Sequence, residues 1–381
     1  MEKGKNKMDE LIRFELAGTR QQVAIATLVR EKPLNSLLLE TIDRLAEKID
    51  AWLADDSIAC IVLDSSSERA FCAGADITVL YDSIKKAGGG NNPHAQAFFL
   101  NEYKLDYALH TAKKPIVVWG NGIVMGGGFG LLGGCSHRIG TPTTRIAMPE
   151  ITIGLFPDAG GTKFLSSLPD SLGLFAGLTG CHLAAGDALR LDLLDVVVAA
   201  ERKKDIFAEL AILPWGSDAR ENAQLVTAML DQYRTSDTLP ENLLPRRERV
   251  TELMETCLGA DNFFSVFDST AAFGDEWLDA AMATYRHGSP TTARVFMEQM
   301  RRAKGMSLAD MFRMELVIAY QCIRHADFPE GIRALLIDKD RNPQWAYKSA
   351  LDVPDSYVEA HFEAAWSGDH PLATLGDPQT N

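Results

Sequence analysis

The sequence predicts an α/β layer fold with a helical C-terminal portion. In the first half of the chain, short apolar stretches rich in branched residues alternate with amphipathic helical spacing, and this β-α-β rhythm is typical of α/β layers. Beyond about residue 187 the strand signals fade and helical patterns dominate. We therefore expect a core over residues 10–215 and a helical region over residues 216–365, both within ordinary domain size.

The first strand–helix–strand unit is expected within residues 23–63. VAIATL at 23–28 and IACIVL at 58–63 have the length and branched content of buried strands. Further strands are expected at 116–119 and 146–148, and two helices within 291–324, broken at Lys304-Gly305. Between the first two strands, apolar residues recur at helical spacing and form one stripe: Leu38, Ile42, Leu45, Ile49 and Leu53.

Composition and charge narrow the classes of function. The chain has 381 residues, of which 46% are hydrophobic and 24% charged, and these globular proportions argue against a disordered or fibrous protein. Its formal charge of 38 − 52 = −14 argues against nucleic-acid or anionic-membrane partners, because both require a basic face.

Cysteine usage and the N-terminus bear on the cellular compartment. The six cysteines are widely spread, with no C-x-x-C pair and no His pair at zinc spacing, so we expect reduced core residues and no metal site. Residues 1–10 are basic but precede no apolar segment, which argues against a secretory signal. Glycines interrupt the uncharged stretch 115–136, which argues against a membrane helix. A cytoplasmic location is the resulting expectation.

Four segments carry candidate chemistry, and the first is AFCAGAD at 70–76. It follows a strand and joins small residues to an acid, which suits a strand-to-helix turn with exposed backbone N–H groups. Taken alone, the segment is better explained as a plain helix N-terminus capped by Asp76.

The second segment, GNGIVMGGGFG at 120–130, is glycine-rich. It leads into a G-x-G-x-x-G match at Gly128, Gly130 and Gly133, with Glu150 at a spacing suited to a ribose contact. The match begins inside a glycine run and not at the end of the preceding strand, so it is a weak dinucleotide signal. A helix start at 125–128, with bare amides facing an anion or developing oxyanion, is the better interpretation.

The third segment, AMPEITIGLFPDAGG at 147–161, holds two carboxylates. Glu150 and Asp158 each follow a proline, which stiffens the loop and aims the acid. Asp158 could instead cap a helix starting near Gly160. Glu150 could instead be a surface acid, although its apolar surroundings disfavour that alternative.

The fourth segment is the expected helix at 94–113. Phe98, Leu105 and Leu109 form an apolar stripe, and Glu102 falls on this stripe. A carboxylate on a buried face is costly unless it is paired or used. A partner Lys or Arg would satisfy Glu102 structurally, and the sequence leaves that alternative as open as a functional one.

Motifs of other enzyme classes are absent: the chain has no G-x-S-x-G, G-K-[ST] or H-E-x-x-H. His110, His137 and His182 have no motif context and are expected to be structural. The residues alone therefore indicate an enzyme with paired backbone N–H donors and one or two carboxylates. Such a site suits acyl chemistry through an oxyanion or enolate, without a metal or redox cofactor.

Taken together, these segments resemble the crotonase (enoyl-CoA hydratase/isomerase) superfamily. AFCAGADI, NGIVMGGGFGL and AMPEITIGLFPDAGG are similar to its three hallmark blocks, and EKPLNSL at 31–37 is similar to its entry segment. The resemblance implies a spiral of β-β-α turns and an acyl-CoA thioester whose carbonyl lies between the amides of Ala75 and Gly127. It also implies coenzyme A contacts at Lys32, Leu34 and Ala73, with no further cofactor.

In three features the sequence resembles the branch of this superfamily that hydrolyses 3-hydroxyisobutyryl-CoA. Gly130 stands where hydratases carry a glutamate, and Pro157-Asp158 stands where they commonly have Pro-Gly. The segment FPEGIRALLIDKDRNPQW at 328–345 is similar to a C-terminal segment of that branch. The substrate-contacting residues implied by this resemblance are Glu102, Gly127, Glu150 and Asp158, with Glu150 and Asp158 as catalytic groups.

The expected activity is hydrolysis of a short, branched 3-hydroxyacyl-CoA, with 3-hydroxyisobutyryl-CoA as the expected substrate in a step of valine degradation. An enoyl-CoA hydratase or isomerase is the alternative enzyme. A catalytically silent acyl-CoA-binding protein is the other alternative, and retention of Glu150 and Asp158 argues against it. The acyl-CoA is the expected partner, a homo-oligomer is compatible with the sequence, and residues 200–290 show little resemblance.

Overall fold

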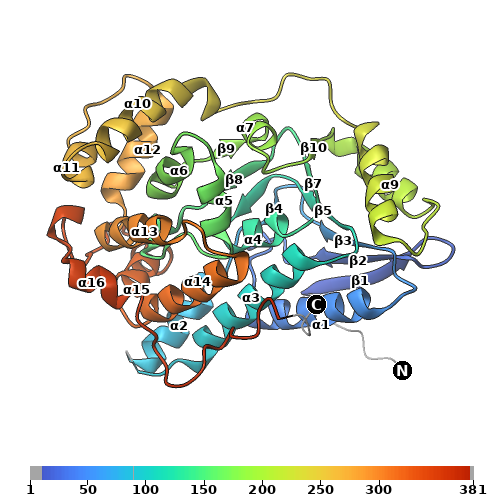
Figure 1. The fold of residues 1–381 in the computed structure, drawn as a ribbon, viewed down its shortest axis with the longest axis horizontal. Helices are drawn as coiled ribbons and strands as arrows, with labels where there is room; N and C mark the ends of the chain where they lie inside the picture. The colour runs from blue at the N-terminus through green and yellow to red at the C-terminus, as the bar shows by residue number, and fades with distance from the viewer. Residues whose placement is uncertain (1–10, 89, 378–381) are drawn as a thin grey trace.

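The computed structural model describes residues 11–88 and 90–377. The first ten residues, including the start of the expected core and the segment tested for a secretory signal, lie outside this description. Figure 1 shows a sheet region flanked by helices, with the C-terminal helix α14 beside α3, α15 beside α2 and α12 beside α6.

A six-stranded sheet has the order β1-β2-β3-β5-β7-β10 and is parallel apart from β1, which pairs antiparallel with β2. The strand expected at 23–28 is confirmed, whereas the one expected at 58–63 lies two residues later, at Cys60–Ser65. Six strands make up this sheet: β1 Ile12–Ala17, β2 Val23–Leu28, β3 Cys60–Ser65, β5 Ile116–Gly120, β7 His137–Gly140 and β10 Val196–Val197.

A second sheet of four short strands has the order β4-β6-β8-β9. Its first three strands run parallel, so their carboxyl ends meet at one edge. Each of the three leads directly into one of the glycine- or proline-marked segments that the sequence singles out. The strands are β4 Ala70–Cys72, β6 Ile123–Met125, β8 Arg145–Ala147 and β9 Leu183–Ala184.

Helices cover the sheets and form most of the chain beyond residue 199. The break expected at Lys304-Gly305 is confirmed, because α13 ends at Arg302 and α14 begins at Leu308. In the N-terminal half lie α1 Leu39–Ala54, α2 Ile77–Ala87, α3 Pro93–Thr111, α4 Gly127–Gly133, α5 Gly161–Ser167, α6 Leu172–Thr179 and α7 Ala185–Arg190. They are followed by α8 Lys203–Leu210, α9 Ala219–Asp231, α10 Arg247–Leu258, α11 Phe263–Asp268, α12 Glu276–His287, α13 Pro290–Arg302, α14 Leu308–Cys322, α15 Asp327–Ile332 and α16 Asp355–Ala360.

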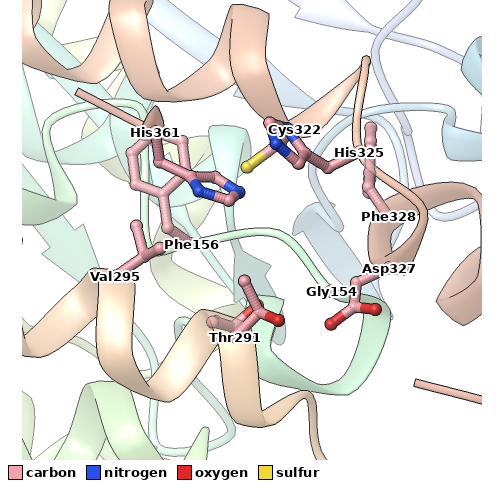
Figure 2. A pocket seen from close by; sticks show the side chains of 10 residues that line it. Gly154, Phe156, Thr291, Val295, Cys322, His325, Asp327, Phe328 and His361 are labelled. Atoms are coloured by element: carbon pink, nitrogen blue, oxygen red, sulfur yellow. The ribbon is translucent and has the colours of Figure 1, made fainter. Parts of the chain in front are cut away.

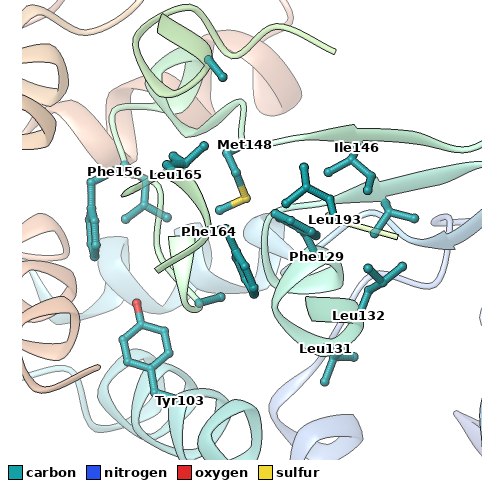
Figure 3. Close-up of a cluster of buried hydrophobic side chains, with 14 of the residues drawn as sticks. Tyr103, Phe129, Leu131, Leu132, Ile146, Met148, Phe156, Phe164, Leu165 and Leu193 are labelled. Atoms are coloured by element: carbon teal, nitrogen blue, oxygen red, sulfur yellow. The ribbon is translucent and has the colours of Figure 1, made fainter. Parts of the chain in front are cut away.

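One buried apolar cluster connects the sheets to the C-terminal helices. The rings of Phe129 on α4 and Phe164 on α5 lie 4.4 Å apart, and Figure 3 shows Met148 pointing at the same pair. On the other side of the cluster, Tyr103 of α3 packs against Phe312 of α14, with ring centroids 6.0 Å apart. Such close packing fixes α3, α4 and α14 relative to one another. The domain division at residue 215 stays a prediction.

Within the described residues, none of the helices has both the length and the continuous apolar character that crossing a lipid bilayer requires.

Candidate active site

A cavity of about 140 Å³ lies where the segments after β4, β6 and β8 approach α3. Five of the residues singled out from the sequence line it together: Ala75, Glu102, Gly127, Glu150 and Asp158. These residues come from four separate segments, and the parallel strands bring three of those segments to the same edge.

The residues expected to contact coenzyme A are only partly gathered at this cavity. Ala73 lines the cavity, and its amide donates to the carbonyl of Leu34 at 3.0 Å. Leu34 has a left-handed backbone with φ +54°, and Lys32 is exposed in the same turn. Leu34 and Lys32 therefore lie beside the rim without lining the cavity, and their contact with coenzyme A stays a prediction.

The backbone around Ala75 leaves its amide available to the cavity. The amide of Leu37 donates to Gly74, and the amide of Asp76 donates to Leu37, both at 2.8 Å. In the described part of the chain, no hydrogen bond takes up the amide of Ala75 itself. Gly74 permits this turn because its φ is +89°, which side chains rarely tolerate.

Gly127 places a second amide at the same cavity. It is the first residue of α4, where backbone N–H groups have no carbonyl within the helix to bind. A Cβ built on Gly74 would lie 3.3 Å from the Gly127 nitrogen, so the two loops touch. A Cβ on Gly127 itself would lie 2.1 Å from Glu102 Oε1, so only glycine fits without moving that carboxyl.

Glu150 begins a short 3₁₀ helix, Glu150–Ile153, directly after β8 and Pro149. Its side chain is only 5% exposed, which removes the surface-acid alternative, and its Oε2 has no hydrogen-bond partner in the described chain. Burial, and then the charge of Asp158, raise its pKa well above the ordinary value. The raised pKa makes the ionised form of Glu150 a stronger base than an ordinary carboxylate.

Asp158 is held by a hydrogen bond and does not cap a helix. The hydroxyl of Tyr103 donates to Asp158 Oδ2 at 2.8 Å, while the N-cap of α5 is Gly160. Burial raises the pKa of Asp158 to about 7, even though the Tyr103 hydrogen bond lowers it. Asp158 is therefore a buried carboxyl oriented by Tyr103, and the capping alternative is wrong. Asp76 likewise makes no capping bond to the backbone of α2, because Thr78 and Arg30 occupy its carboxylate.

Glu102 lies on α3 with 1% of its surface exposed and its Oε1 unpartnered. Within the described chain it makes no ion pair with a Lys or Arg, so the structural alternative lacks its partner. Burial raises its pKa well above the ordinary value, and the charges of Asp158, Glu150 and Glu315 add to that rise. The three cavity carboxyls cannot all be ionised together at low cost, so the cluster retains protons.

Two residues that support the site were not singled out from the sequence. Tyr103, fully buried, orients Asp158. Glu315 on α14 accepts from the amides of Gly160 and Thr162 at 2.9 and 3.0 Å, and so fixes the loop that carries Asp158. Glu315 interrupts an apolar helical run as Glu102 does, and the same reasoning applied there would have identified it.

The glycine match does not form a dinucleotide loop. A Cβ on Gly128 would lie 2.2 Å from the carbonyl oxygen of Cys72, and one on Gly133 would lie 2.0 Å from the Phe164 ring. These glycines are therefore places where α4 packs closely on its neighbours.

A second cavity, of about 10 Å³, lies among the C-terminal helices (Figure 2). Its His325 and His361 rings stack with centroids 4.2 Å apart, and Asp327 accepts from Ser289 and from the amide of Ala346. Among the described residues, no group of three or more His, Cys, Asp or Glu side chains is arranged to hold a metal ion.

Comparisons with known proteins agree on one family. The enoyl-CoA hydratase/isomerase family model matches residues 23–362. Curated relatives named 3-hydroxyisobutyryl-CoA hydrolase, mitochondrial, include those of Danio rerio (33% identical, 94% of this chain and 91% of theirs) and Homo sapiens (31%, 91% and 87%).

Two solved structures have the same fold. A carnitinyl-CoA dehydratase from Mycobacterium thermoresistibile is 31% identical, with a TM-score of 0.82 over 97% of this chain and 100% of that one. An enoyl-CoA hydratase from Rhodobacter sphaeroides is 27% identical, with a TM-score of 0.80 over 93% and 98%. The crotonase-type α/β fold implied by the sequence is thereby confirmed, and the chain belongs to the enoyl-CoA hydratase/isomerase family.

Proposed function

We propose that this chain hydrolyses a short, branched 3-hydroxyacyl-CoA thioester, with 3-hydroxyisobutyryl-CoA as the expected substrate. The observation that carries the proposal is the meeting of two unused amides, at Ala75 and Gly127, with the buried and unpartnered Glu150 carboxyl in one small cavity. The names of the curated relatives support the same reaction.

The two amides would receive the thioester carbonyl oxygen. Charge develops on this oxygen as the carbonyl carbon is attacked, and preorganised N–H donors stabilise it without reorganising. The C–S bond then breaks, the carbonyl re-forms, and the coenzyme A thiolate takes up a proton. The cavity carboxyls, which retain protons, are suited to supplying it.

Glu150 is the proposed main catalytic group. Its raised pKa makes the ionised form a stronger base, which can draw a proton from an attacking water. Alternatively, its free Oε2 can attack the carbonyl carbon and form an anhydride that water then hydrolyses. Both routes end in the same acid and free thiol.

Glu102 and Asp158 are proposed to hold the substrate hydroxyl. Both are buried cavity carboxyls, and a protonated acid can donate to the hydroxyl oxygen while an ionised one accepts from it. A buried polar group left unpaired is costly, so an acyl chain without the hydroxyl should be disfavoured.

The packing at Gly130 argues against hydratase chemistry. A Cβ there would lie 2.8 Å from the Cβ of Ala159 and 2.9 Å from Asp106 Oδ2. No side chain fits beside these neighbours as they stand, so position 130 cannot carry the second acid expected of a hydratase.

The test is an assay for free thiol with 3-hydroxyisobutyryl-CoA, its hydroxyl-free counterpart isobutyryl-CoA, and crotonyl-CoA, each with the full chain and with Glu150→Gln. We expect the full chain to release thiol fastest from the hydroxylated ester and to hydrate crotonyl-CoA very little. We expect Glu150→Gln to lose thiol release from the two saturated esters. Rapid hydration without thiol release would instead establish a hydratase. Tight binding without either reaction would establish a silent binding protein.

Several further expectations remain proposals. Coenzyme A, as part of the substrate, is proposed to pass Ala73 toward Lys32 and Leu34, and no separate cofactor is proposed. The cytoplasmic location is an expectation from the sequence, while several animal relatives are named as mitochondrial. Fractionation of the source cells would decide the compartment.

A further inference from the structure

The face of α3 that packs on α4 carries three titratable side chains at four-residue spacing: Glu102, Asp106 and His110. Residues at this spacing lie on one face of a helix, with neighbouring Cβ atoms about 5–6 Å apart. Opposite them, α4 and the residue after it present glycines. Built Cβ atoms would lie 2.1 Å from Glu102 Oε1 at Gly127 and 2.9 Å from Asp106 Oδ2 at Gly130, whereas the His110 ring nitrogen Nε2 would lie 3.7 Å from a Cβ built on Gly160, just before α5.

Asp106 is the member of this row that the proposed reaction leaves unused. It is 0% exposed, it does not line the cavity, and neither of its carboxyl oxygens has a hydrogen-bond partner in the described chain. Burial raises its pKa well above the ordinary value. Only acidic groups add to that rise: the carboxyls of Glu102, Asp158 and Glu315.

The thiols of Cys72 and Cys135 lie near Asp106 as well, and both are buried with raised pKa values. The raised pKa favours the protonated form of Asp106, which has a proton to pass on. A buried polar group without a partner costs stability and is retained where it has a use.

His110 connects this acid to the surface. Its Nε2 is buried and unpartnered, whereas the residue as a whole is only partly buried. The ring lies between Phe164 and Phe312, at centroid distances of 5.6 and 6.2 Å. Burial, and then the charges of Arg138 and Lys163, lower its pKa to about 4, so a proton that reaches the ring is passed on to water.

Thioester hydrolysis produces a proton that has to leave the buried cavity. Water and thioester give a carboxylic acid and a thiol, and at neutral pH the acid dissociates to a carboxylate and one proton. With the substrate bound as proposed, its coenzyme A portion would occupy the mouth of the cavity. A second path for the proton would let the cavity carboxyls return to their starting protonation states before the products leave.

We propose that Glu102, Asp106 and His110 form a proton relay along α3, which carries the proton released by hydrolysis from the cavity to the surface. The proposal rests on the proposed function. In one concerted transfer, Asp106 passes its proton to His110 Nε2 while the proton of Glu102 moves to the other carboxyl oxygen of Asp106, and the proton released by hydrolysis then restores the O–H bond of Glu102. The ring releases a proton to solvent, and bridging water or rotation of the carboxyls spans each gap.

The test compares Asp106→Asn, which cannot take up and release a proton, with the full chain. A matched control is Asp187→Asn: Asp187 is equally buried but accepts from the amides of Ala184, Asn242 and Leu244 at 2.7–3.0 Å. We expect Asp106→Asn to keep KM and thermal stability while kcat falls roughly tenfold or more. We expect Asp187→Asn to lower the melting temperature while kcat stays unchanged.

Two further measurements make the relay specific. His110→Ala should lose kcat and regain it as imidazole buffer is added, whereas the unaltered chain should not respond to imidazole. The infrared carbonyl stretch of protonated carboxyls in the resting protein at neutral pH should weaken in Asp106→Asn, and this readout does not depend on turnover. An unchanged stretch, an unchanged kcat in Asp106→Asn, or no response of His110→Ala to imidazole would each overturn the relay. If the unaltered chain releases no thiol from 3-hydroxyisobutyryl-CoA, the proposed function is wrong, which is a different outcome from failure of the relay.

Discussion

The hydroxyl of Tyr103 donates a 2.8 Å hydrogen bond to Asp158 Oδ2, joining the middle of α3 to the loop before α5. Both groups are buried, and the bond lowers the pKa of a carboxyl that burial raises to about 7. Tyr103 therefore sets both the direction and the protonation of Asp158. A shift of this pKa would change the charge in the cavity within the physiological range.

Replacing Tyr103 by phenylalanine should raise the pKa of Asp158 further, because the hydrogen bond that lowers it is lost. Asp158 would then stay protonated to higher pH, and the limb of the kcat/KM profile that it governs should move to higher pH. The loss of a buried bond should also cost about 1 kcal/mol of stability. If the kcat/KM profile of Tyr103→Phe lies at the same pH as that of the unaltered chain, Asp158 does not govern catalysis.

Glu150→Gln should lose far more of kcat than Asp158→Asn, because Glu150 is proposed to make or break bonds while Asp158 orients the substrate. Asp158→Asn should raise KM as well. Single-turnover hydrolysis in ¹⁸O-water distinguishes the two routes, since label in the Glu150 carboxylate indicates the anhydride and label confined to the released acid indicates attack by water. Near-normal turnover in Glu150→Gln would make the choice of catalytic group wrong.

Two substitutions of Gly127 should affect the kinetics in different ways. Gly127→Pro removes the amide N–H, and loss of such a donor typically raises the barrier by ~2.7–4 kcal/mol. Gly127→Ala keeps the N–H, but its Cβ would lie 2.1 Å from Glu102 Oε1 and must displace that carboxyl. The alanine variant should therefore lose discrimination for the substrate hydroxyl, and the proline variant should lose kcat on every ester. Circular dichroism checks that both fold, and full kcat in a folded Gly127→Pro would remove the amide from the mechanism.

The contribution of Asp158 and Glu315 to the free energy of unfolding should fall as the pH rises from about 4 to about 7. Asp158 and Glu315 have folded pKa values of about 7, raised by burial above ordinary values of 3.8 and 4.5, so the folded chain binds more protons across this window. Carboxyls with lowered pKa values, such as Asp275 and Glu298, act in the opposite direction at lower pH. His110 and His361, whose pKa values burial lowers to about 4, act in the opposite direction within the window itself. Denaturant unfolding at several pH values measures the slope, and Asp158→Asn should shift it toward positive values. A slope in Asp158→Asn equal to that of the unaltered chain would contradict the assignment.

Local patterns in the sequence were sufficient for some of the elements and for the four segments that line most of the cavity. Strand β2 and the break between α13 and α14 follow from short-range spacing and turn residues, because these depend on the backbone preferences of adjacent residues. Glu102 and Glu150 stand out because a carboxylate inside an apolar pattern must be paired or used.

Only the tertiary structure decided how these acids behave. Tyr103 and Asp158 are 55 residues apart, and Glu315 is 155 residues from Gly160, so no local spacing connects either pair. Local spacing does not identify Asp106 either. Its role is inferred from its packing against the glycines of α4 and from the absence of a basic partner in the described chain. Burial and neighbouring charge set a pKa, and both depend on which distant segments pack around the group. The sequence by itself therefore determined which acids are candidates, whereas packing between distant segments determined which of them hold protons and which partners they meet.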